Sequence, residues 1–171
     1  PNNYNRIREL VISEEMVNDH KIGEGVPLVG LSFGPDGALY GVDWGGGYPL
    51  NESGAVWRID VGQPTALNDR DLTQDLIAAD FGKSEKAQLV KHLGFPDQRV
   101  RLKAQFELAK RGDGAAFTTV AGEVAGNQMA RIHAIWGLGQ LIRKDAAEDE
   151  TLVALFDDAD PEIRAQAIRT V

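Results

Sequence analysis

The sequence predicts an α+β protein, in which a short antiparallel β segment is followed by an α-solenoid of about three helix pairs. Two observations lead to this prediction. Eleven of the 19 glycines lie in the first 62 residues, among short β-type runs that turns separate. From residue 84 onward the apolar residues recur with helical spacing, and one helix motif occurs three times.

The composition limits the possible functions of the chain. Its 171 residues are 43% hydrophobic, which suits one packed domain or two small ones and excludes wholesale disorder. The lack of cysteine excludes a disulfide scaffold, a thiolate zinc site, a cysteine nucleophile and an attached c-type haem within these residues. The net charge of -8 disfavours nucleic acid as a partner. No apolar run approaches the roughly 20 residues of a membrane span, so no membrane insertion is expected.

The first half contains four β-type runs, at 9–12, 28–33, 39–43 and 56–59. The motif Gly34-Pro35-Asp36-Gly37 between the second and third runs predicts a turn, because Pro35 presets φ and Gly37 accepts a positive φ. Apolar residues alternate on both sides of this turn, as in a hairpin. We therefore expect one small antiparallel sheet.

The second half is predicted to be helical. A connector over 61–83 becomes helical near 71–79, and Ser84 is expected to cap a helix over 85–93. Short helices are predicted at 86–93, 115–124 and 150–156, each followed by a longer one. The longer helices at 99–110 and 131–142 should be apolar on two sides, as for a helix with neighbours on both. In the first of these, Phe106 belongs to the second apolar side.

The repeated motif begins at Asp97, Asn127 and Asp160, each of which can cap a helix. An apolar residue follows three positions later, and a small alanine follows one turn beyond it. The arginine between them, which is Arg101 in the first repeat, should reach carboxylates or carbonyls of a neighbouring repeat; its equivalents are Arg131 and Arg164.

Two segments resemble known families. Residues 31–44, LSFGPDGALYGVDW, resemble a blade motif of soluble glucose/sorbosone-dehydrogenase-type β-propellers. The D-x-x-V-R-x-x-A repeats resemble bacterial HEAT repeats. Their order along the chain is similar to that of large exported, membrane-bound dehydrogenase-like proteins of planctomycetes and verrucomicrobia. The resemblance divides the chain into a terminal propeller blade at 1–62, a linker at 63–83 and a HEAT solenoid, truncated at its C-terminus, at 84–171.

The resemblance implies a fragment of a quinoprotein-like sugar or alcohol dehydrogenase, periplasmic or at the cell surface. The parent protein would carry pyrroloquinoline quinone and haem c, and this piece would hold neither cofactor. We expect a piece of a longer chain, because it begins without methionine and ends inside an amphipathic stretch. Its role would be to position the catalytic and electron-transfer modules, without activity of its own. Two alternatives remain open: a non-catalytic protein–protein interaction scaffold, and a complete small binding protein whose sheet packs on the solenoid.

Asp43, Trp44 and Tyr48 are the candidate substrate-binding residues. They follow a predicted strand, and loops at one end of a propeller line its central funnel. An aromatic ring can stack on a sugar while a carboxylate accepts hydrogen bonds from its hydroxyls. The alternative is that Asp43 caps a turn and Trp44 packs between blades. For Asp36 we expect turn chemistry, because the other oxygen ligands of a calcium loop are missing.

No metal site is predicted from the three histidines. His133 occupies the repeat position that holds Lys103 and Gln166 elsewhere, so this position is expected to face solvent. His92 ends a short helix, where a cation suits the helix dipole. His20 lies in a polar stretch. We expect the basic middle of the solenoid to serve inter-repeat pairing or protein docking; its residues are Arg99, Arg101, Lys103, Lys110, Arg111 and Arg131.

Overall fold

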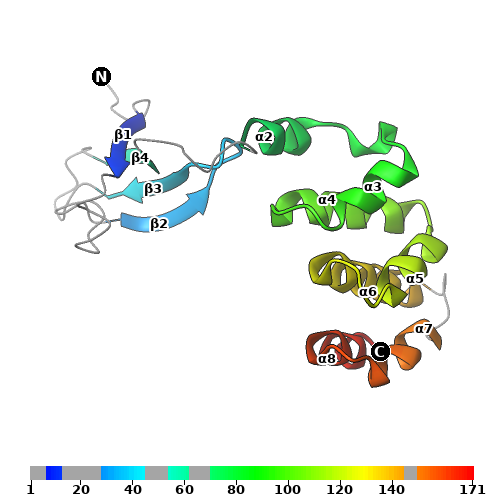
Figure 1. Ribbon diagram of the computed structural model, residues 1–171. Coiled ribbons are helices and arrows are strands. Elements are labelled where there is room, and N and C mark those ends of the chain that lie inside the picture. Colours follow the sequence, from blue (N-terminus) through cyan, green and yellow to red (C-terminus); the bar gives the residue numbers. More distant parts are fainter. Residues whose placement is uncertain (1–6, 13–27, 45–53, 62–69, 145–149) are drawn as a thin grey trace. The chain divides into compact units, whose positions relative to one another are not determined.

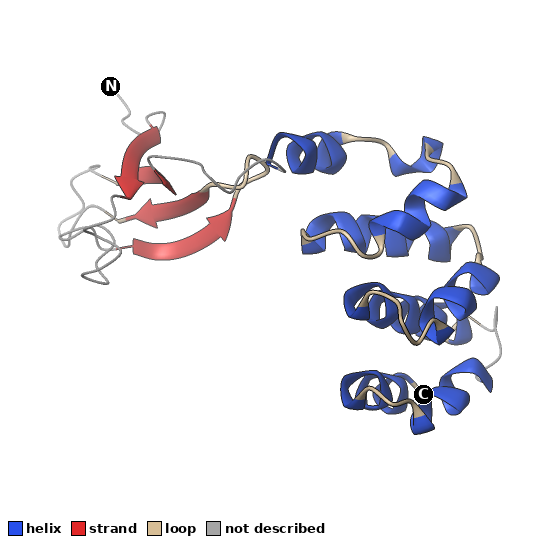
Figure 2. Cartoon of the chain, viewed as in Figure 1, coloured by secondary structure: helices blue, strands red, loops and turns tan. Residues whose placement is uncertain are grey.

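The computed structural model describes residues 7–12, 28–44, 54–61, 70–144 and 150–171. The chain divides into two compact units, Pro1–Asp75 and Leu76–Val171, which we call the sheet unit and the helical unit. Their boundary falls inside the predicted linker at 63–83. Strands occupy the first unit and helices dominate the second, which confirms the predicted α+β class (Figures 1 and 2).

The sheet unit contains a four-stranded sheet with the order β1-β4-β3-β2. Its strands are β1 (Ile7–Ile12), β2 (Leu28–Phe33), β3 (Leu39–Asp43) and β4 (Ala55–Val61). The last three form the predicted antiparallel meander. The prediction is wrong for β1, which pairs with β4 in parallel. A parallel neighbour needs a long connection, and the chain between β1 and β4 supplies it by passing through two other strands.

The hairpin between β2 and β3 follows the predicted register. Phe33 lies opposite Leu39 and Leu31 lies opposite Gly41. The Gly34 amide donates to the Ala38 carbonyl at 2.8 Å and closes the turn. Gly37 has a φ of 74°, which is the left-handed conformation that the third residue of such a loop requires.

The helical unit contains three consecutive helix pairs, as predicted. They are α3 (Lys86–His92) with α4 (Gln98–Lys110), α5 (Gly114–Gly122) with α6 (Gln128–Ile142), and α7 (Glu150–Ala154) with α8 (Pro161–Thr170). Before them lie α2 (Arg70–Ala78), which crosses the unit boundary, and a 3₁₀ turn at Phe81–Lys83. A second 3₁₀ turn, Leu155–Asp157, follows α7. Helices α4, α6 and α8 form one layer, and α3, α5 and α7 form the other (Figure 1).

The repeated motif caps its helices as predicted. Asp97 accepts a hydrogen bond from the Arg99 amide at 2.8 Å, and Asn127 accepts one from the Ala130 amide at 3.0 Å. Asp160 likewise caps α8. The predicted cap at Ser84 is wrong by one residue. Helix α3 begins after Glu85, whose amide donates to the Gln88 side chain, while Ser84 ends the preceding 3₁₀ turn.

One continuous apolar core runs through the helical unit, from Phe81 to Ala167. Helix α6 is buried on two sides, as predicted, because it packs against α4, α5 and α8. Helix α4 differs from the prediction. Ala104 and Leu108 are fully buried, but Phe106 is 53% exposed. On the second predicted side Ala109 is buried and Leu102 is half-buried, so Phe106 is the residue that departs from the prediction there.

Candidate functional site

The predicted substrate residues lie at the end of β3. Asp43 is buried, and one of its carboxylate oxygens accepts a hydrogen bond from the indole Nε1 of Trp57 at 3.2 Å. Trp44 follows and is 46% exposed. Tyr48 lies outside the described residues. The Trp57 indole therefore competes with a sugar hydroxyl for this carboxylate oxygen. A substrate site at these residues stays a prediction.

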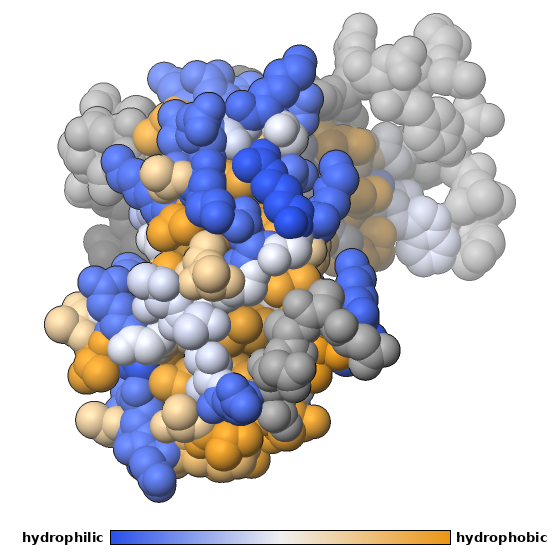
Figure 3. All heavy atoms as spheres, turned by 90° about the vertical axis from the view of Figure 1, so that its right-hand side faces the viewer, coloured by the Kyte–Doolittle hydropathy of each residue, from blue (hydrophilic) through white to orange (hydrophobic). Residues whose placement is uncertain are grey.

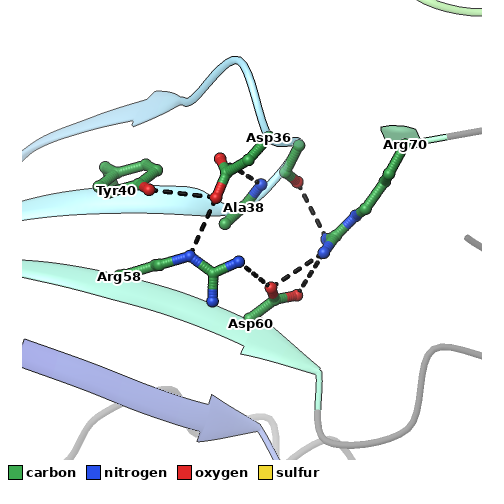
Figure 4. Close-up of polar contacts among 7 residues, drawn as sticks. Asp36, Ala38, Tyr40, Arg58, Asp60 and Arg70 are labelled. Atoms are coloured by element: carbon green, nitrogen blue, oxygen red, sulfur yellow. Dashed lines mark hydrogen bonds and ion pairs between the residues drawn. The ribbon is translucent and has the colours of Figure 1, made fainter. Parts of the chain in front are cut away.

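A network of two aspartates and two arginines joins the hairpin turn, β4 and the start of α2 (Figure 4). Asp36 accepts a hydrogen bond from Arg58 Nε at 3.0 Å. Arg58 also pairs with Asp60 at 2.7 Å, and Asp60 pairs with Arg70 at 2.8 Å. Arg70 donates in addition to the Gly37 carbonyl at 3.0 Å. This network fastens the turn to the neighbouring strand within the sheet unit.

Asp36 therefore does more than the turn chemistry expected of it. Burial raises its pKa, but hydrogen bonds from Arg58, the Ala38 amide and the Tyr40 hydroxyl together lower it below the ordinary value. The hydrogen bond to Asp36 raises the pKa of Arg58. These contacts favour the charged forms of both groups. Tyr40 and Arg58 lie opposite each other on β3 and β4, and both contact Asp36. This cross-strand pair could have indicated the network, but the sequence analysis missed it.

His133 was expected to face solvent, and this prediction is wrong. Its side chain is buried. Arg101 Nε donates to His133 Nε2 at 3.0 Å, because an arginine can only donate. The proton of the neutral ring therefore sits on Nδ1, which donates to the Gln105 amide oxygen at 2.7 Å. Burial and the nearby charge of Arg101 lower the His133 pKa to about 4.

The equivalent residues also contact the element before them rather than solvent. Lys103 Nζ donates to the carbonyls of Ile77 and Ala79, both at 2.7 Å, at the end of α2. Gln166 accepts a hydrogen bond from the indole of Trp136 on α6 at 2.9 Å. At this shared position a polar residue contacts the preceding element each time, and its partner differs from one repeat to the next.

The arginine of the repeated motif reaches neighbouring polar groups, as expected. Arg131 donates to the Ala121 carbonyl at 2.9 Å and forms an ion pair with Asp158 of the next repeat. The two side chains of this pair are only 3% and 5% exposed. Arg101 binds a carbonyl of the loop before its own helix in addition to His133 of the next repeat. Arg164 binds a carbonyl of the loop before its own helix, which differs from the expected contact with a neighbouring repeat. These contacts confirm inter-repeat pairing for part of the basic middle.

The remaining histidines are His92 and His20. His92 stacks on Phe81 with ring centroids 5.3 Å apart, and burial lowers its pKa, so the expected helix-end cation is wrong. His20 lies outside the described residues. Among the residues that the structure describes, no cluster of three or more histidine or acidic side chains is placed to hold a metal ion.

Two adjoining hollows of about 380 Å³ each run along the layer of α4, α6 and α8. We call them together the basic groove; Phe106, Gln140 and Arg143 line both, Lys110 and Lys144 line one, and Arg169 lines the other. Among the described residues that line the groove, four are basic and none is acidic. Phe106, Trp136 and Arg169 each lie five positions after the motif arginine. These three groove residues therefore occupy one equivalent position of the repeats. Aligning the repeats at this position could have revealed them from the sequence.

A third hollow adjoins the groove on the other side of Phe106. It is lined by Lys103 and Lys110 and also by two acidic residues, Asp80 and Glu107. Glu107 is already paired with Arg111 at 2.8 Å. The unbroken basic stretch is therefore confined to the first two hollows.

Comparison with protein-family models, with curated proteins and with solved structures yields no match to this chain. Within the described ranges, none of the helices has the length and apolar character that crossing a bilayer requires.

Proposed function

We propose that the helical unit is a protein-binding scaffold. Stacked helix pairs form an extended surface that suits a partner chain. The observation that supports this proposal is the basic groove, where a large aromatic side chain, Phe106, stands more than half exposed among basic residues. Exposed aromatic and arginine side chains are the ones that protein interfaces favour.

The opposite layer provides the internal comparison. Figure 3 shows the face of α3, α5 and α7, where hydrophilic side chains gather over α3 and hydrophobic ones over α7. Lys86 on this face forms an ion pair with Asp113. We expect partner binding on the layer of α4, α6 and α8, because the basic groove with the exposed Phe106 lies there.

Site-specific photo-crosslinking tests the scaffold function. A photoreactive phenylalanine analogue replaces Gln140 in the groove, and as a matched control it replaces Thr119 on the exposed side of α5. In cells that naturally produce the chain, we expect a discrete protein adduct from position 140 and none from 119. Mass spectrometry of the adduct identifies the captured partner. That partner, once purified, should bind the purified chain without crosslinking. Equal adducts from both positions, or none from either, would contradict the proposal.

A second candidate function concerns the sheet unit. We infer from its exposed strand that it is one blade of a quinoprotein-like sugar or alcohol dehydrogenase, exported, with pyrroloquinoline quinone and haem c held elsewhere in the parent. Val29, Leu31 and Phe33 on β2 are 66%, 60% and 67% exposed. A neighbouring sheet that packs face to face would cover such side chains. Sequencing the gene on both sides tests this: further G-P-D-G blades and a C-x-x-C-H motif would support it, and an unrelated upstream fold would contradict it.

A further inference from the structure

We propose that the basic groove binds an extended acidic peptide segment of another protein, with one apolar side chain placed against Phe106. This inference rests on the scaffold function proposed above, and it adds the chemistry of the partner. It is supported by the charge of the groove, the exposure of its residues and its length.

The charge of the groove is unbalanced. Lys110, Arg143, Lys144 and Arg169 are all exposed. Lys110 lies 3.7 Å from Glu107, whose carboxylate is closer to Arg111. The other three form no ion pair with a carboxylate in the described part of the chain. Carboxylates of a partner complement these four cations, and arginine can bind a carboxylate through two parallel hydrogen bonds.

The shape of the groove suits a peptide rather than a small molecule. Neighbouring helices in a layer lie about 8–10 Å apart, so three helices span about 20 Å. About six residues of extended chain cover that distance. Phe106 lines both hollows, so an apolar side chain at the middle of the segment would contact its ring.

Nucleic acid fits the groove less well. The net charge of -8 opposes an acidic peptide and a phosphate backbone alike, so contacts rather than charge distinguish the two ligands. Successive bases need successive stacking surfaces. The second aromatic of the groove, Trp136, is half-buried, and its indole nitrogen is bonded to Gln166.

Fluorescence anisotropy with the full chain tests the proposal. The probe is a labelled peptide of about eight residues, all Glu and Asp except for one central Phe. We expect binding that weakens as salt is added. A peptide with Ser in place of Phe should bind about fivefold more weakly, and one with Lys in place of the acidic residues should not bind. A single-stranded DNA oligomer of similar length should also not bind.

Two variants with equal charge change locate the site. Arg143→Glu with Lys144→Glu should weaken binding of the acidic peptide about tenfold or more. Lys83→Glu with Lys91→Glu, at exposed positions outside the groove, should change it by about twofold or less. Phe106→Ala should abolish the preference for the Phe-containing peptide. Circular dichroism checks that each variant keeps its helices.

Three results would overturn the proposal: no binding of the acidic peptide, equal weakening by the two double variants, or tighter binding of the DNA. The crosslinking result then separates the two proposals. If position 140 captures a partner while the acidic peptide fails to bind, the scaffold function stands and the partner chemistry is wrong. If neither is seen, both proposals fail.

Discussion

The apolar residues of the helical unit form one buried cluster from Phe81 to Ala167, whereas the buried apolar residues described in the sheet unit are Ala38, Ala55 and Ile59. In the sheet unit an ion-pair network around Asp60 joins the hairpin turn, β4 and the start of α2. A helix pair buries its apolar face against the next pair, but a small sheet leaves side chains exposed unless something covers it. The helical unit therefore supplies its own core, whereas the described apolar side chains of β2 in the sheet unit are exposed.

The largest expected difference between the units comes from two phenylalanines. Phe117 on α5 is fully buried, with its ring against Gly137, whereas Phe33 on β2 is 67% exposed. Phe117→Ala should lower the free energy of unfolding by about 4 kcal/mol, because it leaves a cavity. Phe33→Ala should change it by about 0.5 kcal/mol or less. Hydrogen exchange of the amides in each unit measures both effects. A large loss for Phe33→Ala would show that the sheet unit has an apolar core of its own.

Two arginines provide the next comparison. Arg131→Ala should cost about 3 kcal/mol of stability, because it leaves the carboxylate of Asp158 buried without its partner. Arg58→Ala should cost about 1 kcal/mol or less, because its pair with Asp36 is about one-quarter exposed. Urea unfolding at low and high salt distinguishes the two, since salt should screen only the second pair. As a control, Arg131→Met with Asp158→Leu should recover most of the loss; failure to recover it would contradict the electrostatic explanation.

The smallest effect concerns pH and is expected in the helical unit through His133. The pKa of His133 falls from 6.5 to about 4 on folding, so the unfolded chain binds the proton more readily. Its contribution to stability is full above pH 6.5 and is lost as the pH falls toward 4, by about 2 kcal/mol at about pH 5. The pKa of Asp36 lies below 3.8, so the sheet unit should not respond in this window through that group.

Hydrogen exchange between pH 6.5 and 4.5 measures the pH effect in each unit. His133→Gln should remove most of it, since glutamine is the residue at the equivalent position of the next repeat. His92→Gln is the control at a second histidine with a lowered pKa. An unchanged pH response in His133→Gln would show that another group is responsible.

The features that sequence predicts correctly are set by local chemistry. Pro35 and Gly37 define a turn wherever they occur in this order, and the turn fixes the register of β2 on β3. Asp97, Asn127 and Asp160 cap helices through amides two or three residues away. Such interactions need no knowledge of the rest of the fold, so the α+β class and the helix pairs are predictable.

The features that sequence predicts wrongly depend on distant partners. Lys103, His133 and Gln166 look like surface residues because all three are polar, yet each is satisfied by a contact with the element before it. Phe106 looks buried because it is apolar, yet the described residues leave it exposed. The alternation of apolar and polar residues in β1 also does not show whether the strand pairs in parallel or antiparallel with its neighbour. Asp43, a candidate substrate residue, contacts Trp57 on the neighbouring strand. This contact joins two strands, so the sequence of either strand alone does not predict it.

The contacts of Lys103, His133 and Gln166 have a consequence for the order of the repeats. An ammonium group meets carbonyls at the first junction, an imidazole meets a guanidinium and an amide at the second, and an amide meets an indole at the third. In an array of identical repeats every junction is the same, so units can be exchanged, added or deleted without changing any contact. Here an exchange would leave polar groups facing the wrong partners. The sequence of units is therefore chemically specified, and a duplicated repeat would need new residues on both of its sides before it could join the array.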